Sequence, residues 1–250
     1  MKFVRFRKDD CCSYGLLEGD LVKKIEGDIF GDFKITECCY DIADVEILIP
    51  CQPSKIVCVG LNYRAHAQEV NLALPEEPVI FLKPPSAALP HKGKIVRPAM
   101  SGRVDYEGEV GIVIGKMAKN VKPEEAYSCI FGATCFNDVT ARDLQSKDGQ
   151  WTRAKSFDTF APFGPCIATG LNYDNLSIEL LLNGEVKQKS NTSDLIFNIS
   201  QIVSFISQVM VLMPGDVIAT GTPSGIGPMN SGDTVQVKVE GVGVLENYVV

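Results

Sequence analysis

The segment DYEGEVGIVI, residues 105–114, decides how the rest of the chain is interpreted. Its apolar residues predict a β-strand, and side chains two positions apart on a strand point to the same face. Glu107 and Glu109 would therefore share a face, with Gly108 leaving the opposite face uncrowded. Acidic residues are poor strand formers, and two close carboxylates repel unless a cation or a proton lies between them. A metal-binding pair is one interpretation, and an exposed strand face is the other.

A third carboxylate favours the metal interpretation. Asp138 follows the apolar run Cys129–Phe136, within the segment CFNDVTARD. Two carboxylates from one strand and a third from the end of another form a set of hard oxygen ligands, which suits Mg²⁺ or Mn²⁺. Zinc is disfavoured because no Cys or His lies at ligand spacing nearby.

The elements around this segment are mostly short strands. Apolar or alternating runs predict strands over 56–59, 131–137 and 235–239, and Pro123 begins a short helix that extends to Cys129. Prolines between Leu74 and Pro98 exclude a helix and predict an extended, loop-rich path. One core-packing helix has apolar residues at helical spacing, namely Ile199, Ile202, Val203, Ile206, Val209 and Met210. The predicted fold class is therefore mainly β or α+β.

The first fifty residues predict a separate small unit. Gly15, Gly19, Gly27 and Gly31 separate short strands at the spacing of hairpins. The composition changes around the prolines at positions 50 and 53, where a boundary is plausible. We expect a small β-rich N-terminal domain over residues 1–52 and a larger domain over 53–250.

Composition limits the classes of function. The chain has 250 residues, 45% of them hydrophobic and 22% charged, and a net charge of −7, so a general nucleic-acid binder is unexpected. The N-terminus has no apolar signal segment, and the stretch Ile199–Met213 is too short and polar to span a bilayer. We expect a cytoplasmic protein with no membrane partner. Its nine cysteines should be reduced and non-catalytic, with Cys58, Cys129, Cys135 and Cys166 buried.

A histidine and a glutamate form a candidate general base. In GLNYRAHAQEV, residues 60–70, His66 precedes Glu69 by three positions, which makes the two side chains neighbours on a helical turn. A carboxylate beside an imidazole orients the ring and raises its basicity. A surface helical pair is the alternative. The second histidine, His91, is expected to be a solvated turn residue.

Further polar groups lie in two later segments. Lys155, among aromatic residues, is either an anion-binding group or a surface lysine with a buried stem. Arg142 and Gln145 would lie on one side of a helical turn that begins after Asp138. The loop ATGTPSGIGP, residues 219–228, offers backbone N–H groups and hydroxyls to an anion. Motifs of serine hydrolases, zincins, thioredoxins and dinucleotide-binding proteins are absent from the sequence.

These pieces, in this order, resemble the fumarylacetoacetate hydrolase family. The resemblance covers about residues 55–249, and its motifs are specific as a set for the family but not for one activity. They are GLNYRAHAQE at 60–69, FLKP at 81–84, DYEGEVGIVIG at 105–115, NDVTARDLQ at 137–145, AKSFDTFAPFGP at 154–165, LNGEVKQ at 182–188 and PGDVIATGTPSGIG at 214–227. Residues 2–50 look like the variable N-terminal domain that many members carry.

The resemblance implies a mixed β-sandwich roll and a divalent cation, Mg²⁺ or Mn²⁺. It places that cation on Glu107, Glu109 and Asp138, without the fourth carboxylate of some eukaryotic members. It matches His66 and Glu69 with a water-activating dyad whose segment is often a lid. It further implies a homodimer. The residues it assigns to the substrate pocket are Lys155 as a catalytic lysine, and Lys83, Arg142, Gln145, Gly221 and Thr222 as substrate contacts.

The resulting hypothesis is a metal-dependent enzyme that cleaves a carbon–carbon bond in a small 2,4-dioxo carboxylic acid of the acylpyruvate type. His66, oriented by Glu69, would activate the water. An isomerase or decarboxylase of 2-hydroxydienedioates or oxaloacetate at the same metal is the alternative, and a non-catalytic, metal-stabilised binding protein is a third. The presence of both His66 and Glu69 favours hydrolysis.

Overall fold

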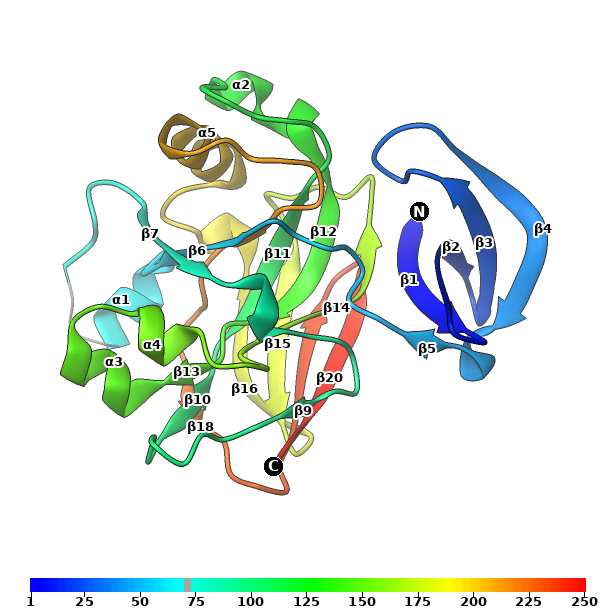
Figure 1. Cartoon of the computed structure of the whole chain (residues 1–250). Coiled ribbons are helices and arrows are strands. Elements are labelled where there is room, and N and C mark those ends of the chain that lie inside the picture. The colour runs from blue at the N-terminus through cyan, green and yellow to red at the C-terminus, as the bar shows by residue number, and fades with distance from the viewer. Residues whose placement is uncertain (70–72) are drawn as a thin grey trace.

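The computed structural model describes residues 1–69 and 73–250, and most of its regular structure is β-strand (Figure 1). The strands are β1 Lys2–Lys8, β2 Cys11–Glu18, β3 Leu21–Gly27, β4 Phe33–Asp41, β5 Glu46–Ile47, β6 Ile56–Gly60, β7 Val79–Lys83, β8 Ala88–Leu89, β9 Lys94–Ile95, β10 Val104–Tyr106, β11 Gly108–Ile114, β12 Ile130–Asn137, β13 Thr140–Ala141, β14 Ala161–Ala168, β15 Ser177–Leu182, β16 Glu185–Asn191, β17 Val217–Ala219, β18 Gly227–Pro228, β19 Thr234–Val239 and β20 Gly243–Val249.

The helices are few and short, as the sequence predicted. The α-helices are α1 Arg64–Glu69, α2 Pro123–Ala126, α3 Arg142–Asp148, α4 Thr152–Lys155 and α5 Ile199–Val209. The 3₁₀ turns are η1 Ile42–Asp44, η2 Pro85–Ala87, η3 Tyr127–Cys129 and η4 Thr192–Asp194. Val70, the last residue of the segment quoted around His66, lies outside the described residues.

The strands form three sheets, of which the two larger are mixed and the smallest is purely antiparallel. The largest has twelve strands, in the order β4-β3-β2-β1-β14-β12-β11-β17-β6-β7, with β5 and β8 attached at its side. A five-stranded sheet has the order β16-β15-β19-β20-β9, and β13-β10-β18 form a third. The β6–β17, β8–β14 and β9–β20 pairs are parallel. This arrangement confirms the mainly β, mixed-sheet fold.

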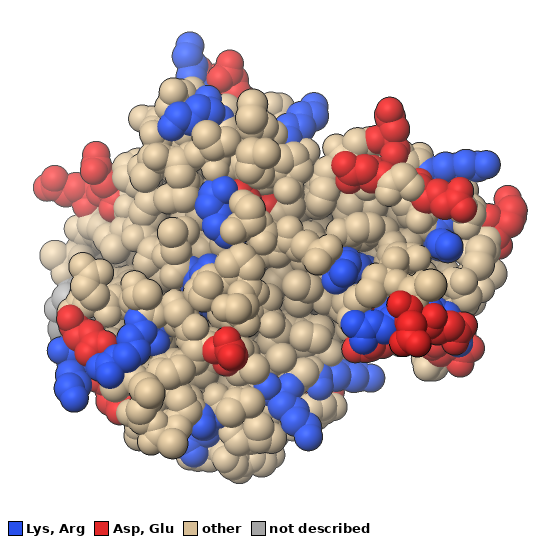
Figure 2. All heavy atoms as spheres, in the orientation of Figure 1, with Lys and Arg blue, Asp and Glu red and all other residues tan. Residues whose placement is uncertain are grey.

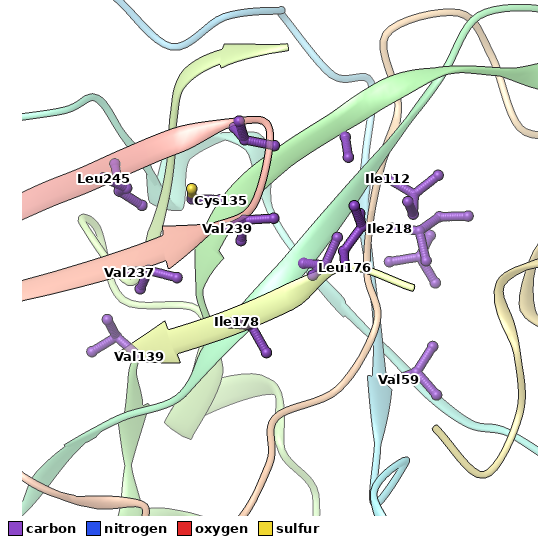
Figure 3. Close-up of a cluster of buried hydrophobic side chains, with 14 of the residues drawn as sticks. Val59, Ile112, Cys135, Val139, Leu176, Ile178, Ile218, Val237, Val239 and Leu245 are labelled. Carbon is purple, nitrogen blue, oxygen red and sulfur yellow. The ribbon is translucent and has the colours of Figure 1, made fainter. Parts of the chain in front are cut away.

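The main core lies between the twelve-stranded and five-stranded sheets. Figure 3 shows side chains of the larger sheet, such as Ile112 and Cys135, in one cluster with Val237 from β19. The four cysteines expected to be buried are buried, and all nine cysteines are free thiols. Alternating apolar residues along β19 face this core, as the period of two predicted.

Helix α5 confirms the predicted periodicity except at its end. The side chains of Ile199, Ile202 and Ile206 are fully buried in the core. The Asn198 side chain caps the helix by accepting a hydrogen bond from the Gln201 N–H at 2.9 Å. The Gln201 side chain in turn accepts a hydrogen bond from the Asn198 N–H. Val209, predicted to face the core, is 54% exposed because the helix terminates there.

The proline-rich segment is extended as predicted, apart from one helical turn. Strand β7 pairs with β6 along five residues at the edge of the sheet. Pro85 begins the 3₁₀ turn η2, which proline tolerates because the first turn needs no N–H from it. The prolines therefore exclude a long helix but not a single turn.

The N-terminal strands extend the large sheet instead of forming a sheet of their own. Strand β1 pairs with β14 through Lys2–Ala168 and Phe3–Ile167. The Phe3 side chain is buried against a second core cluster that also contains Phe163. In Figure 1 these strands lie to one side of the main body, and in Figure 2 acidic side chains gather over them. Within the described residues, no helix has both the length and the apolar character needed to cross a membrane.

The directions of the strands bring several strand ends to one edge of the large sheet. The parallel strands β6 and β17 both end there. Strand β11 runs antiparallel to β17 and to β12, so its beginning lies at the same edge as the end of β12. The segments that leave these strand ends contain nearly all of the predicted site residues.

Candidate metal centre and active-site pocket

Three carboxylates meet where β10, β11 and β12 come together. Glu107 connects β10 to β11, Glu109 lies in β11, and Asp138 follows β12. Pairing of β11 with β12 places Gly108 opposite Asn137, and the Asp138 N–H donates to the Glu107 carbonyl at 2.8 Å. All three side chains are buried, and one carboxylate oxygen from each lies within 4.8 Å of the others. The structure therefore brings the predicted triad together through strand pairing.

The predicted continuous strand over 105–114 is interrupted at Glu107. Strand β10 belongs to the three-stranded sheet, whereas β11 belongs to the twelve-stranded sheet. The Glu107 N–H donates to the Asn137 side chain at 3.0 Å, and the Gly108 N–H donates to the Gln188 side chain at 2.8 Å. Side-chain amides thus replace the backbone ladder where the chain changes sheets. The period-two argument was wrong in detail, yet the two carboxylates still converge.

Two cationic side chains, buried Lys155 and half-buried Arg142, lie among the carboxylates. Lys155 Nζ donates to Glu107 at 2.9 Å and to Asp138 at 2.6 Å. Arg142 donates to the other Glu107 oxygen, and its Nε donates to Asp105 at 2.9 Å. Burial alone would lower the pKa of Lys155, but the charges of Asp138 and Glu107 raise it above its ordinary value. Lys155 is therefore a charged group inside the protein and not a surface lysine.

The carboxylates differ in how well their charge is compensated. Burial would raise the pKa of Glu107, but Lys155 and Arg142 hold it well below its ordinary value. Burial and the neighbouring carboxylates raise the pKa of Glu109 well above its ordinary value. The main group opposing that rise is the Gly221 N–H, which donates to Glu109 at 2.7 Å. Among the described residues, no cationic side chain pairs with Glu109.

This donor set fits a hard divalent cation. Glu109 is a buried carboxylate without an ion-pair partner in the described part of the chain, and such a group is costly unless a cation or a proton neutralises it. Glu107 and Asp138 offer oxygens within the same 4.8 Å, and Mg²⁺ and Mn²⁺ prefer oxygen ligands. The three residues together could hold one such ion.

The His66–Glu69 pair lies on α1, at the edge of the same cavity. His66 Nδ1 and Glu69 Oε2 are 3.0 Å apart, and His66 is 7% exposed. The other Glu69 oxygen accepts from the Gly225 N–H at 2.9 Å. Glu69 therefore links α1 to the glycine-rich loop after β17. Asn62 holds the start of this segment by donating to the Thr220 carbonyl at 2.8 Å.

The predicted substrate contacts divide into pocket residues and supporting residues. Arg142 and Gln145 lie on α3, line the cavity and are joined by a 2.6 Å hydrogen bond. Lys83 is fully buried and does not line the cavity. It donates to Asp138 and to the carbonyls of Val139 and Phe160, at 2.9 and 2.6 Å. Lys83 is thus placed to hold Asp138 and not to touch a substrate, which corrects that expectation.

The glycine-rich loop supplies one side of the site. Thr222 lines the cavity and donates through its hydroxyl to the Gly108 carbonyl at 3.0 Å. Gly221 binds Glu109 through its N–H and has φ +104°, where a Cβ would also meet Asn62 at 2.7 Å. Only glycine is suited to this position.

The sequence did not identify two supporting residues. Asp105 is buried and accepts from both Arg103 and Arg142 at 2.8–3.1 Å. Gln188 is buried on β16 and binds Gly108, Thr222 and the Pro223 carbonyl. A buried amide so far along the chain gives no local signal of this role. His91, expected to be solvated, is half-buried instead, and its Nδ1 accepts from the Glu246 N–H at 3.1 Å.

The site opens into a cavity of about 300 Å³. The acidic triad, Lys155 and Arg142 form one end, and His66 lies on its wall. The remaining lining includes apolar side chains, among them Phe81 and Trp151. The arrangement brings three carboxylates, an imidazole and fixed positive charge into one concave space, a combination typical of enzyme active sites.

Two family models match the chain along nearly its whole length. Residues 55–250 match the family described as fumarylacetoacetate (FAA) hydrolase C-terminal, and residues 1–50 match the family described as Rv2993c-like, N-terminal. The first match covers well over half of the chain.

Three individual proteins illustrate the similarity. A structure described as 5-carboxymethyl-2-hydroxymuconate delta-isomerase from Mycobacterium smegmatis is 44% identical, with a TM-score of 0.95 over 100% of this chain and 99% of that one. Fumarylpyruvate hydrolase from Pseudomonas aeruginosa, in complex with Mn²⁺ and pyruvate, is 33% identical, with a TM-score of 0.76 over 81% and 91%. A rat protein named oxaloacetate tautomerase Fahd2a, mitochondrial, is 40% identical over 83% of this chain and 70% of its own length.

Proposed function

The chain belongs to the fumarylacetoacetate hydrolase family, and from this premise we propose that it is a divalent-metal-dependent hydrolase of small 2,4-dioxo carboxylic acids of the acylpyruvate type. The observation that carries the proposal is the position of His66. Its ring lines the same cavity as the acidic triad, and its Nδ1 is held by Glu69 at 3.0 Å. Relatives named as hydrolase, isomerase and tautomerase support an enzyme of this family.

The acidic end of the cavity would receive the cation and the anionic head of the substrate. Glu107, Glu109 and Asp138 would hold Mg²⁺ or Mn²⁺, in keeping with the Mn²⁺ in the fumarylpyruvate hydrolase structure. When bound, such an ion acts as a Lewis acid that polarises a 2-oxo carboxylate and offsets negative charge developing on it. Lys155 and Arg142 add fixed positive charge at the same end.

His66 would act as the general base. With Nδ1 held by Glu69, the Nε2 atom is the one free to accept a proton from water, because the described residues offer it no hydrogen bond. The hydroxide adds to the 4-carbonyl carbon, and the C3–C4 bond then breaks. Its electron pair stays on C3, which takes up the proton held by His66. The products are a carboxylic acid and pyruvate, so one water is consumed and the atoms balance.

Lys155 would stabilise the charge that develops on the pyruvate side during cleavage. Its ammonium group is buried and fixed by two carboxylates, so it needs no reorganisation at the moment of reaction. A preorganised donor of this kind is typically worth about 3–4 kcal/mol of barrier.

The test measures acetylpyruvate cleavage by loss of enol absorbance with Mn²⁺ and with EDTA. We expect turnover only with the metal. His66→Ala should lower kcat/KM by at least about a hundredfold, because general-base assistance is worth 10²–10⁴. Its affinity for Mn²⁺ alone should not change. Glu69→Gln should lower kcat/KM less than His66→Ala does, because a glutamine side chain still orients the imidazole ring. Metal-independent turnover would contradict the proposal.

A second candidate is a tautomerase, isomerase or decarboxylase at the same site. The observations that favour it are the names of the M. smegmatis isomerase and the rat oxaloacetate tautomerase. Such reactions need no attacking water, so His66→Ala should reduce them much less than it reduces acylpyruvate hydrolysis. Equal losses on oxaloacetate and acetylpyruvate would show that His66 acts in binding, and its role in water activation would have to be abandoned.

A further inference from the structure

Gln188 joins the strand of the acidic triad to the loop that follows β17. It lies on β16, the edge strand of the five-stranded sheet, and its side chain is buried. Its Oε1 accepts from the Gly108 N–H at 2.8 Å, and its Nε2 donates to the Thr222 hydroxyl at 2.8 Å and to the Pro223 carbonyl at 2.7 Å. Gly108 is the residue between the two glutamates of the triad. One side-chain amide therefore connects the candidate metal ligands to the glycine-rich loop.

The partners of this amide fix its orientation. The Gly108 N–H can only donate and the Pro223 carbonyl can only accept, so the Gln188 oxygen faces the first and its nitrogen the second. The Thr222 hydroxyl closes a ring of hydrogen bonds, because it accepts from Gln188 and donates to the Gly108 carbonyl at 3.0 Å. A hydroxyl has one hydrogen to donate, so protein groups hold the Thr222 side chain on both its donor and its acceptor side.

The loop held in this way forms part of the cavity. Residues 220–226 connect β17 to β18, and Thr222 and Ile226 line the cavity together with the triad. The loop also packs on β16, because a Cβ at Gly225 would come within 2.2 Å of the Lys187 carbonyl oxygen. In the described part of the chain, the amide discussed above makes the only side-chain hydrogen bonds between β16 and this loop.

We propose that Gln188 is a positioning residue for the 2-oxo acid, which holds Thr222 and its loop in the arrangement that receives the ligand. This inference rests on the proposed function, because it assumes that a 2-oxo carboxylate binds in this cavity. Without the amide, the loop would have to be ordered when the ligand binds, and that cost lowers the affinity. The carboxylates of the triad have hydrogen-bond partners of their own, namely Lys83, Arg142, Lys155 and the Gly221 N–H.

The first test compares Gln188→Met with Asn247→Leu. Asn247 is a matched control because it is a buried amide in the same sheet, donates to the carbonyls of Pro90 and Gly93 at 2.9 and 3.1 Å, and does not line the cavity. The probe is pyruvate, which is a product of the proposed reaction and is bound in the fumarylpyruvate hydrolase structure. It is titrated into the Mn²⁺-loaded proteins while the fluorescence of Trp151, the only tryptophan and a lining residue, is recorded.

Gln188→Met should weaken pyruvate binding at least about tenfold, the factor expected when no more than about a tenth of the molecules hold the loop in place. Asn247→Leu should bind pyruvate as the wild type does. Both variants should lower Tm by about 2–10 °C, because each leaves buried backbone groups without a partner. Gln188 bonds none of the three carboxylates, so the affinity for Mn²⁺ alone should fall by less than the roughly tenfold typical of a group that orients a metal ligand.

A double-mutant cycle tests whether Gln188 acts through Thr222. Thr222→Val replaces the hydroxyl by a methyl group of similar size and removes the bond from Gln188. Adding Gln188→Met to this variant should then weaken pyruvate binding by no more than about threefold, because the two residues form one hydrogen-bond network.

The outcomes separate the inference from the proposed function. Wild-type pyruvate affinity in Gln188→Met, or an equal loss in Asn247→Leu, would overturn the inference while binding of 2-oxo acids stands. A loss of Mn²⁺ affinity as large as the loss of pyruvate affinity would also overturn it, as would an undiminished effect in the Thr222→Val background. If pyruvate does not change the fluorescence of the wild type in an Mn²⁺-dependent way, the proposed function fails and the inference falls with it.

Discussion

Glu109 is the residue on which metal binding at the proposed site would depend most. Glu107 and Asp138 both have Lys155 as a partner, whereas Glu109 receives only the Gly221 N–H. The raised pKa of Glu109 follows from its burial and from the adjacent carboxylates. A bound divalent cation would supply the positive charge that Glu109 lacks, so this side chain should contribute strongly to the affinity for the metal.

Glu109→Gln should weaken Mn²⁺ binding by at least about a hundredfold, since loss of even a supporting group costs 10–100-fold. The glutamine side chain keeps the shape of glutamate and an oxygen that accepts from the Gly221 N–H, but it carries no negative charge. Asp148→Asn, which alters an acid paired with Arg153 outside the cavity, is the control and should bind normally. Affinities are measured by isothermal titration with Mn²⁺. Wild-type affinity in Glu109→Gln would remove this residue from the site.

Lys83 illustrates a positioning role that its residue type does not reveal. It is fully buried, and burial lowers its pKa despite the adjacent Asp138. Its bonds run to Asp138 and to two backbone carbonyls. The ammonium group thus fixes the orientation of one carboxylate of the triad from behind.

Lys83→Met should destabilise the protein by about 3–5 kcal/mol, because it leaves a buried charge without its partner. It should also weaken Mn²⁺ binding about 10–100-fold, as expected for a group that orients a ligand. Lys55→Met is the matched control, because Lys55 pairs with buried Asp216 away from the cavity. Urea unfolding and Mn²⁺ titration are run on both. A stability loss without any change in Mn²⁺ affinity would make Lys83 purely structural.

At the scale of elements, helix α5 shows which predictions a local pattern supports. Its period gave the buried face correctly, and the Asn198 capping box fixes where it begins. The residue at which α5 ends could not be predicted from this period, because Val209 continues the apolar pattern and yet is exposed. Where the last turn terminates depends on what the following residues pack against.

Ile202→Ala in α5 should cost about 2–5 kcal/mol of unfolding free energy, because it leaves a cavity in the core. Val209→Ala should change the same quantity by less than about 0.5 kcal/mol, since that side chain is exposed. Both are measured by urea unfolding monitored by circular dichroism. Similar losses in the two variants would mean that the end of α5 is packed in solution.

The strand over 105–114 shows what a local pattern misses at this scale. The apolar residues predicted one strand, but the chain changes sheets at Glu107. The chain can change sheets because the side chains of Asn137 and Gln188 accept hydrogen bonds from the backbone N–H groups of residues 107 and 108. Asn137 and Gln188 lie far from Glu107 in the sequence, so the residues next to Glu107 do not indicate that the chain changes sheets there.

At the scale of the whole molecule, the cation would be part of what holds the fold together. The triad joins the end of β12 to the beginning of β11, and Gly221 joins it to the loop after β17. Withdrawal of the metal would leave buried Glu109 beside two other carboxylates without a cationic partner among the described residues. Stability should therefore depend on metal and on pH together.

Mn²⁺ at a hundred times its Kd should stabilise the protein by about 2.7 kcal/mol. For a chain of 250 residues that raises Tm by about 5–10 °C. Because the folded-state pKa of Glu109 is raised, the metal-free protein keeps a proton there that the cation must displace. The Tm increment at fixed Mn²⁺ should therefore grow as pH rises and shrink as pH falls. Calorimetry from about pH 6 to 8 checks this, and an increment independent of pH would contradict it.

The N-terminal strands also belong to this scale. The sequence predicted a small β-rich domain over residues 1–52, and strands β1–β5 lie within that range. The structure joins it to the rest through the β1–β14 pairing, which no property of residues 1–52 indicates. An edge strand can pair with any compatible partner, so the choice of β14 depends on the assembled sheet.

The sequence by itself determined the mainly β fold class, several of the strands, the period of α5 and the residue types of the acidic triad, because these depend on side chains close together along the chain. The order of the motifs along the chain also indicated the family. Only the tertiary structure decided that Lys83 lies behind Asp138 and that Asp105 and Gln188 support the site. Those relations join residues far apart in sequence, and their energies come from burial and from pairing that exist only once the sheets have assembled.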